Sequence, residues 1–314
     1  MTQEILQTAA NESRPAETVE PLPFPFQQHT FCRYEPVEKR IDEARVLVVD
    51  DLLRDAGDLS EVAQQEWAAT TNVQLKRERK IAGMAIDNIL NNVERLVKNP
   101  VTRVAHLSDL SSVEAEFQPH AIVLSGTLRD FDFYRKEILD NFSQFIHRTS
   151  TPVLAICGGH QLVGLSFGAR VVTLDNFEQH EQRNNRPQEY QYRFIRITDT
   201  SDPIFQGVDN STSSNWQDYT KKARILRVWQ NHGLQLDRVP EGFKLLATSY
   251  LCRNQMMVRR DNKQLIYTVQ FHLEKSFEDW NISRTRWEHP NESRDGRILF
   301  ENFLHLALAR QSTK

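Results

Sequence analysis

The segment PVLAICGGHQL, from Pro152 to Leu162, places one cysteine between a buried-looking apolar run and a pair of glycines. A strand must end there and the chain must turn into a helix, with Cys157 at the bend and Gly158 and Gly159 directly after it. Such a turn exposes the reactive atom, and the helix N-terminus beyond it favours the thiolate and can receive an oxyanion. The local pattern alone leaves a nucleophile and a buried structural cysteine equally open.

A thiol nucleophile needs a base, and the base needs a group that orients it. His272 ends the apolar run LIYTVQF, and Glu274 follows two residues later. Residues i and i+2 of an extended chain point to the same side, so the imidazole and the carboxylate can meet. Taken alone, His272 is more typical of a capping residue at a strand end. Together with Cys157 it predicts a Cys-His-Glu triad.

Strands that alternate with helices must position these residues. ARVLVVDDL predicts a buried strand that ends in Asp50 and Asp51, and the segment from there to Pro100 has a mainly helical pattern, with an exposed helix face expected at the basic run KRERK. Short strands are expected at TRVAHL, HAIVLSG and PVLAIC, with helices between them. This alternation predicts an α/β fold of three layers, with a doubly wound, mostly parallel sheet.

The pattern changes after about residue 170 to short strands with few helices between them. YRFIRIT, ARILRVWQ, FKLLATS and QMMVRR indicate an antiparallel extension of the sheet. Two polar stretches, DNFEQHEQRNNRPQEYQ and DNSTSSNWQDYTKK, are expected to form surface loops. The closing segment RDGRILFENFLHLALAR predicts a helix that docks on the core. Residues 1–44 are polar and rich in proline, so we expect an N-terminal extension and one catalytic domain over 45–314.

Charge and cysteine usage exclude several classes of function. The 314 residues carry 39 basic and 42 acidic side chains, well mixed, so nucleic acid is not an expected partner. Cys32, Cys157 and Cys252 lie far apart and form no CxxC pair, which argues against a zinc ribbon and a disulfide framework and favours the cytoplasm. No apolar run is long enough to span a membrane, and no membrane contact is expected. We expect no metal and no other cofactor.

Several segments resemble, in the same order, the class I glutamine amidotransferase family, which includes γ-glutamyl hydrolase-like members. AICGGHQ resembles the family elbow G-[IV]-C-x-G-x-Q, and VQFHLE is similar to its histidine motif V-Q-F-H-P-E. AIVLSGT resembles the strand and loop that usually contain LSGGP, VWQNHGLQLDRVPEGFKLLATS resembles a segment that often carries a histidine, and GRILFENFL resembles the closing helix. The resemblance runs from about Arg45 to Leu308.

The resemblance implies roles for the triad and for the residues around it. Cys157 would attack the side-chain amide of glutamine, or a related γ-glutamyl amide, and form a thioester, while His272 transfers protons and Glu274 orients it. The family pattern also implies an oxyanion hole and a substrate pocket, which fall on Gly126, Thr127 and Gly158 and on Gln161 and His232. A structural histidine is an equal alternative for His232.

Three positions depart from the family pattern. Ala155 replaces the first glycine of the elbow, and Leu273 replaces the proline of H-P-E. SGTLRDF replaces a GGPG-like loop, so Thr127 and Leu128 stand where permissive glycine and proline usually do. We therefore expect an oxyanion loop of another shape.

The resemblance favours a glutamine amidotransferase-type enzyme that supplies ammonia to a separate acceptor-activating protein. A partner is expected because the chain contains no phosphate loop of the GxxxxGK[ST] type. A stand-alone γ-glutamyl amide or peptide hydrolase would use the same triad and stays open. A non-catalytic regulatory protein that retains the fold is the third alternative.

Overall fold

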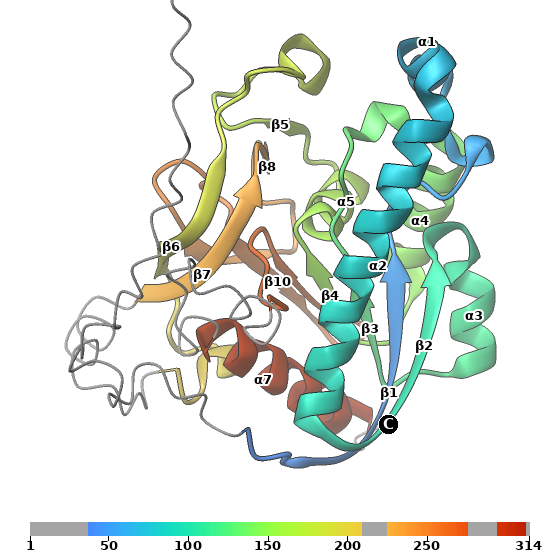
Figure 1. Ribbon diagram of the computed structural model, residues 1–314. Coiled ribbons are helices and arrows are strands. Elements are labelled where there is room, and N and C mark those ends of the chain that lie inside the picture. Colours follow the sequence, from blue (N-terminus) through green and yellow to red (C-terminus); the bar gives the residue numbers. More distant parts are fainter. Residues whose placement is uncertain (1–36, 209–224, 276–293, 312–314) are drawn as a thin grey trace, which may run out of the picture.

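The computed structural model describes residues 37–208, 225–275 and 294–311. In these ranges the chain forms a central sheet between two layers of helices (Figure 1). The helices are α1 (Glu61–Trp67), α2 (Thr71–Leu96), α3 (Leu110–Phe117), α4 (Lys136–Arg148), α5 (Gly158–Ser166) and α7 (Arg294–Gln311). The strands are β1 (Ile41–Asp50), β2 (Val97–His106), β3 (Ala121–Leu124), β4 (Val153–Ile156), β5 (Val171–Thr173), β6 (Glu189–Ile197), β7 (Ile225–His232), β8 (Leu234–Leu236), β9 (Lys244–Thr248), β10 (Met256–Arg260) and β11 (Leu265–Val269).

The main sheet has a parallel half and an antiparallel half. Among the described residues its nine strands follow the order β2-β1-β3-β4-β11-β10-β9-β6-β7. Strands β2, β1, β3, β4 and β11 pair in parallel, and β10, β9, β6 and β7 continue the sheet with antiparallel pairing. Strands β5 and β8 form a small separate sheet. The predicted doubly wound sheet with an antiparallel extension is confirmed.

Strands β4 and β11 are neighbours in the parallel half although a long stretch of chain separates them. Leu154 pairs with Tyr267, and Ile156 pairs with Val269. The carboxyl ends of parallel strands lie at the same edge of a sheet, which is where open α/β sheets place their ligand sites. The residues that follow β4 and β11 therefore leave the sheet side by side.

The two faces of the sheet are covered by two apolar cores, because successive residues of a strand point to opposite faces. Val46 and Val48 of β1 pack in the core beneath α2 and α7. Leu47 and Val49 pack in the core formed with α1, α3, α4 and α5. These two cores fix the parallel strands from both sides.

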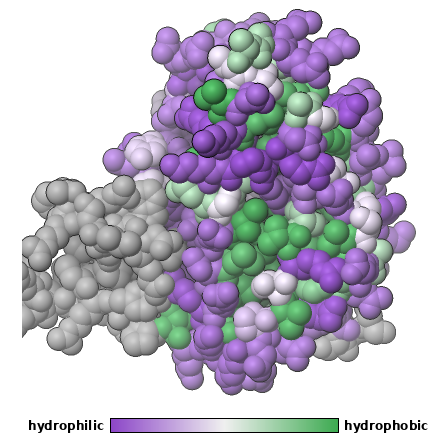
Figure 2. Space-filling view, turned by 45° about the vertical axis from the view of Figure 1, so that its right-hand side comes forward, coloured by the Kyte–Doolittle hydropathy of each residue, from purple (hydrophilic) through white to green (hydrophobic). Residues whose placement is uncertain are grey.

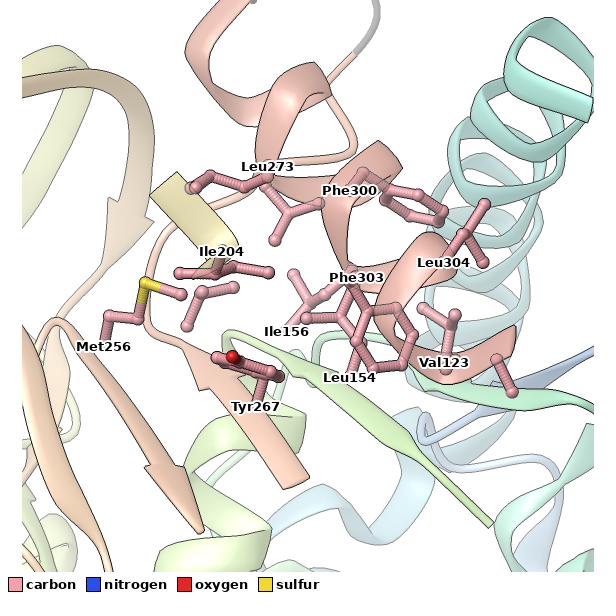
Figure 3. Packing of buried hydrophobic residues seen from close by; sticks show 14 of the residues in the cluster. Val123, Leu154, Ile156, Ile204, Met256, Tyr267, Leu273, Phe300, Phe303 and Leu304 are labelled. Atoms are coloured by element: carbon pink, nitrogen blue, oxygen red, sulfur yellow. The ribbon is translucent and has the colours of Figure 1, made fainter. Parts of the chain in front are cut away.

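Helix α7 docks on the face of the sheet next to the end of β11. Figure 3 shows Phe300 and Phe303 of α7 packed over the side chains of β3 and β4. The first turn of α7 also reaches the segment after β11, because a Cβ added to Gly296 would lie 2.7 Å from the carbonyl oxygen of Leu273. The predicted docking helix is confirmed, and its glycine permits this close approach.

Some predicted segments lie outside the described residues or begin elsewhere. Strand β1 starts at Ile41, four residues before the predicted start of the catalytic domain, and residues 1–36 are not described. The second polar stretch, 209–222, is not described either. The proposed division of the chain at residue 44 stays a prediction. Within the described part, no helix combines the length and hydropathy that a membrane span requires.

Edge strand β2 and helix α2 expose several apolar side chains. Val101 and Val104 of β2 and Val73 and Met84 of α2 are each at least 40% exposed. Figure 2 turns this side of the molecule forward and shows hydrophobic residues gathered in the middle of the face, with hydrophilic residues around them.

Candidate active site

Cys157 occupies a strained turn between β4 and α5. Its backbone angles are φ 51° and ψ −104°, in a region that non-glycine residues rarely adopt. Its N–H donates to the carbonyl oxygen of Val269 at 2.7 Å, so β11 holds the turn in place. The side chain is 5% exposed and lines a cavity. The predicted strand, bend and helix are all present.

His272 and Glu274 lie just after the end of β11 and form a pair. The Nδ1 atom of His272 lies 2.8 Å from Oε1 of Glu274. The backbone N–H of His272 donates to the carbonyl oxygen of Trp229 at 2.8 Å, and the amide of Asn92 donates to the carbonyl oxygen of Glu274 at 2.6 Å. The predicted meeting of imidazole and carboxylate is thus present in the structure, held by β7 and α2.

The thiol and the imidazole converge on one glycine. A Cβ added to Gly126, in the loop after β3, would lie 3.5 Å from Cβ of Cys157 and 3.5 Å from Cε1 of His272. A larger residue at this position would occupy the space in front of both groups. Gly126 therefore leaves room where a substrate can contact them.

Electrostatics favour the charged form of His272. Burial lowers the pKa of its imidazole, but the negative charges of Glu274 and Cys157, with hydrogen bonds to both, outweigh burial and raise the pKa to about 10. The imidazole is therefore protonated at neutral pH.

The loop after β3 lies against the turn that carries Cys157. Ser125 donates its N–H to the carbonyl oxygen of Val49 at 3.0 Å and accepts the N–H of Gly159 at 3.1 Å. A Cβ added to Gly158 would lie only 2.6 Å from Cβ of Thr127 and would also overlap its backbone nitrogen. Thr127 thus takes the space that a side chain at position 158 would need. The predicted oxyanion residues Gly126, Thr127 and Gly158 are together at the elbow.

A cavity of about 730 Å³ opens over these groups. Six of the predicted site residues line it, namely Gly126, Thr127, Cys157, Gln161, His232 and His272. Glu274 and Gly158 are not among its lining residues, because Glu274 pairs with His272 and Thr127 covers Gly158. The structure therefore brings every predicted site residue to one place.

The two predicted pocket residues are held by the protein itself. The amide of Gln161 donates to the carbonyl oxygen of Leu234 at 3.2 Å and to Oε1 of Gln270 at 3.1 Å. The Nδ1 atom of His232 lies 2.9 Å from the carbonyl oxygen of Leu234, and its Nε2 lies 3.1 Å from the buried Glu189 carboxylate. Both ring nitrogens of His232 thus have protein partners, as the structural alternative for this histidine expects.

Gln270 is a site residue that sequence reasoning did not single out. Its side-chain amide donates to the Sγ atom of Cys157 at 3.7 Å. Gln270, His272 and Glu274 are spaced two residues apart, so the i, i+2 rule that paired the last two could have included the first. Asn231 also lines the cavity and was not singled out.

Three buried side chains near the cavity form a set of possible metal ligands. The ligand atoms of Glu189, His232 and Cys252 lie within 4.8 Å of one another, and this combination of oxygen, nitrogen and sulfur suits Zn²⁺. Glu189 also accepts hydrogen bonds from Gln255 at 2.7 Å and Ser249 at 3.0 Å. Burial, followed by the charge of Glu189, raises the pKa of the Cys252 thiol.

The KRERK face was predicted to be exposed, and the structure corrects this for Glu78. The side chain of Glu78 is fully buried, because Arg129 donates to it at 2.7 Å from the loop after β3. Burial raises the pKa of Glu78, and Arg129 acts against that rise. One acidic residue in the basic run therefore faces inward and anchors the loop.

The fold and the site define an α/β protein with a cysteine on a strained turn beside a histidine–glutamate pair. The family model of glutamine amidotransferase class-I matches residues 84–286, more than half of the chain, and the chain belongs to this family. The resemblance of the sequence motifs is thereby confirmed.

Relatives with curated names match part of the chain. The glutamine-hydrolyzing GMP synthase of Haemophilus influenzae is 30% identical over 160 residues, which cover 51% of this chain and 26% of that protein. A subunit of the glutamine-hydrolyzing GMP synthase of Thermococcus kodakarensis is 34% identical over 137 residues, 44% of this chain and 56% of that one. The match thus covers about a quarter of the length of the first relative and about half of the length of the second.

A solved structure from Thermoplasma acidophilum, described as a subunit protein of GMP synthase, shares the fold. It superposes with a TM-score of 0.52 at 20% identity, over 86% of this chain and 96% of that one.

Proposed function

We propose that the protein hydrolyses the side-chain amide of glutamine through a cysteine thioester and supplies the ammonia to a separate acceptor-activating protein. One observation carries the proposal: Cys157, on its strained turn, and His272, paired with Glu274, converge on Gly126 at the floor of a cavity. This arrangement supplies a nucleophile, a proton carrier and an orienting carboxylate in contact with one substrate site.

The first half of the reaction forms a thioester. The thiolate of Cys157 attacks the amide carbon, a C–S bond forms, and the carbonyl π electrons move to the oxygen. The backbone N–H of Gly158 is proposed to receive the resulting oxyanion, since the first N–H groups of a helix have no partner within it, together with the N–H of Thr127 from the loop after β3. The oxyanion then collapses, the C–N bond breaks, and the protonated imidazole of His272 gives its proton to the leaving ammonia.

The second half releases glutamate. The now neutral imidazole takes a proton from water, which attacks the thioester carbon, and the C–S bond breaks to return the thiolate. Glu274 stabilises the imidazolium in both halves. Its hydrogen bond to Nδ1 also directs Nε2 toward Cys157 and the substrate.

The names of the relatives support the substrate and the need for a partner. The two curated relatives are named as glutamine-hydrolyzing GMP synthases, and the name of the Thermococcus kodakarensis protein describes it as one subunit of that enzyme. This favours the amidotransferase over the stand-alone γ-glutamyl hydrolase and the non-catalytic protein. We also propose the cytoplasm as its location, consistent with the unpaired thiols of Cys157 and Cys252.

The proposal is tested by incubating the purified chain with glutamine and measuring glutamate and ammonia. A glutamine-like chloroketone, with the adduct located by mass spectrometry, tests the nucleophile in parallel. We expect hydrolysis and a single adduct on Cys157. Absence of both would refute the proposal, and hydrolysis of γ-glutamyl amines without hydrolysis of glutamine would establish the stand-alone hydrolase instead.

A further inference from the structure

The far end of the loop after β3 is tied to the first polar stretch. Asp130 lies three residues after Thr127, and its side chain is 10% exposed. Arg186 donates to both of its carboxylate oxygens, at 2.8 Å each, and Arg183 donates to Oδ2 at 2.8 Å. The loop that carries the oxyanion residues is thus held by two arginines that come from another part of the chain.

Further contacts strengthen this attachment. Arg183 also pairs with Asp132 at 2.5 Å and with Glu66 of α1 at 3.0 Å. The amide oxygen of Gln179 accepts the backbone N–H of Phe131 at 2.9 Å. The polar stretch was predicted to be a surface loop, and most of its residues are exposed, but Arg183 and Arg186 line the cavity.

Arg186 joins three parts of the site. Its Nε donates to the carbonyl oxygen of Gln182 at 2.9 Å, within the polar stretch. Its aliphatic stem lies so close to Gly233, beside His232, that a Cβ at position 233 would be 2.8 Å from its Cδ atom. Its guanidinium holds Asp130. The side chain is only 11% exposed, so water competes little for these contacts.

We infer that Arg186 is a positioning residue for the oxyanion loop. Where the family loop has glycine and proline, this chain has Thr127 and Leu128, which leave the backbone without a stiff proline. The planar, bidentate pair between Arg186 and Asp130 supplies the missing restraint and keeps Thr127 against Gly158. The inference rests on the proposed function, because the loop has a catalytic purpose only if an oxyanion forms.

The inference predicts an effect on one step of the reaction. An oxyanion forms only after the thiolate attacks a carbonyl, so a loosened loop lowers kcat and leaves substrate binding unchanged. Alkylation of Cys157 by iodoacetamide forms a C–S bond and expels iodide without an oxyanion. A loosened loop therefore leaves the alkylation rate unchanged.

The test compares Arg186→Lys with the wild-type chain. Lysine keeps the charge but loses the bidentate geometry. We expect kcat for glutamine to fall about tenfold, in line with small misplacements of catalytic groups. KM and the rate of alkylation by iodoacetamide should stay within about twofold by the same argument. Hydrogen exchange should become faster in the peptide that contains Thr127 and Asp130, and stay unchanged at the turn of Cys157.

Two further variants complete the test. Asp130→Asn also weakens the pair with Arg183, so it should lower kcat at least as much as Arg186→Lys. The double variant should be no worse than Asp130→Asn alone, because the pair between the two residues is already lost. Arg260→Lys is the matched control, since Arg260 pairs with the buried Asp202 at 3.0 Å at the opposite end of β11 and should leave kcat and loop exchange unchanged.

The outcomes separate the inference from the proposed function. Unchanged kcat and unchanged loop exchange in Arg186→Lys would overturn the inference, and so would an equal fall in kcat and alkylation. If the wild-type chain does not hydrolyse glutamine, the proposed function fails, while loop exchange still decides whether Arg186 holds the loop.

Discussion

The two sides of the site are built by different kinds of contact. On the side of Cys157 and His272, backbone hydrogen bonds from neighbouring strands fix the chain, through the carbonyl oxygens of Val269 and Trp229. On the side of Thr127, backbone bonds hold the loop after β3 at Ser125, but side chains tie its far end to another part of the chain, as in the pair of Arg186 with Asp130. Backbone contacts are independent of residue type, whereas each side-chain contact can be lost by one substitution. The nucleophile side should therefore tolerate variation better than the oxyanion side.

The largest effect is expected where the nucleophile itself is removed. Cys157→Ser keeps the turn and its backbone contacts but replaces the thiolate with a poor nucleophile, so glutamine hydrolysis should fall by at least about 10³-fold. Ammonia release measures it. Cys252→Ser, at a buried thiol that does not line the cavity, is the control and should stay active. Full activity in Cys157→Ser would remove this residue from the mechanism.

The next effect tests the contact between the two sides. In Gly158→Ala the new methyl group overlaps Thr127, so the oxyanion loop must move away from the elbow. We expect kcat to fall by about 10²- to 10³-fold, as when an oxyanion donor is lost. Gly83→Ala is the matched control, because nothing lies within 4 Å of a Cβ there.

Gly83 lies within α2, so its alanine variant should be fully active and about 1 kcal/mol more stable in denaturant unfolding. Equal activity of the Gly158→Ala and Gly83→Ala variants would show that the loop does not need its place beside Gly158.

A smaller effect is expected on the base. Glu274→Gln removes the charge that holds His272 protonated, and kcat should fall by about 10²-fold. Folding raises the pKa of His272 from 6.5 to about 10. The contribution of the protonated imidazole to the stability of the folded chain is therefore complete below pH 6.5 and is lost as the pH rises through 10. Thermal unfolding should show a steeper loss of Tm over this window in the wild-type chain than in Glu274→Gln. Parallel pH profiles of Tm would contradict the role of Glu274.

The smallest effect concerns Gln270. Gln270→Leu removes one amide donor from the Cys157 sulfur, and the loss of one hydrogen bond should lower kcat by about two- to tenfold. Gln264→Leu, which removes a buried amide bonded to the carbonyl oxygens of Ile146 and Thr149, should lower stability and leave kcat unchanged. A similar loss of kcat in both variants would assign the effect of Gln270 to packing.

The same difference between backbone and side-chain contacts explains how much the sequence predicted. The turn at Cys157 and the pair of His272 with Glu274 follow from local spacing, because strand periodicity and two glycines determine them. The contacts of Asp130 could not be predicted: its arginine partners lie 53 and 56 residues away. With 39 basic and 42 acidic side chains mixed along the chain, charge alone does not indicate which of them pair. Polar composition therefore predicted the exposed loop but not that two of its arginines line the site.

The adjacency of β4 and β11 has a consequence for the order of folding. Gln270 and Cys157 touch although they are 113 residues apart, so this pairing closes a long loop. Pairing two strands that are far apart in the sequence costs loop-closure entropy before their contacts can stabilise the pair, so such strands tend to pair late in folding. A nascent chain would thus carry its cysteine without its histidine until the sheet is nearly complete. Reactivity toward glutamine would then report the completion of folding.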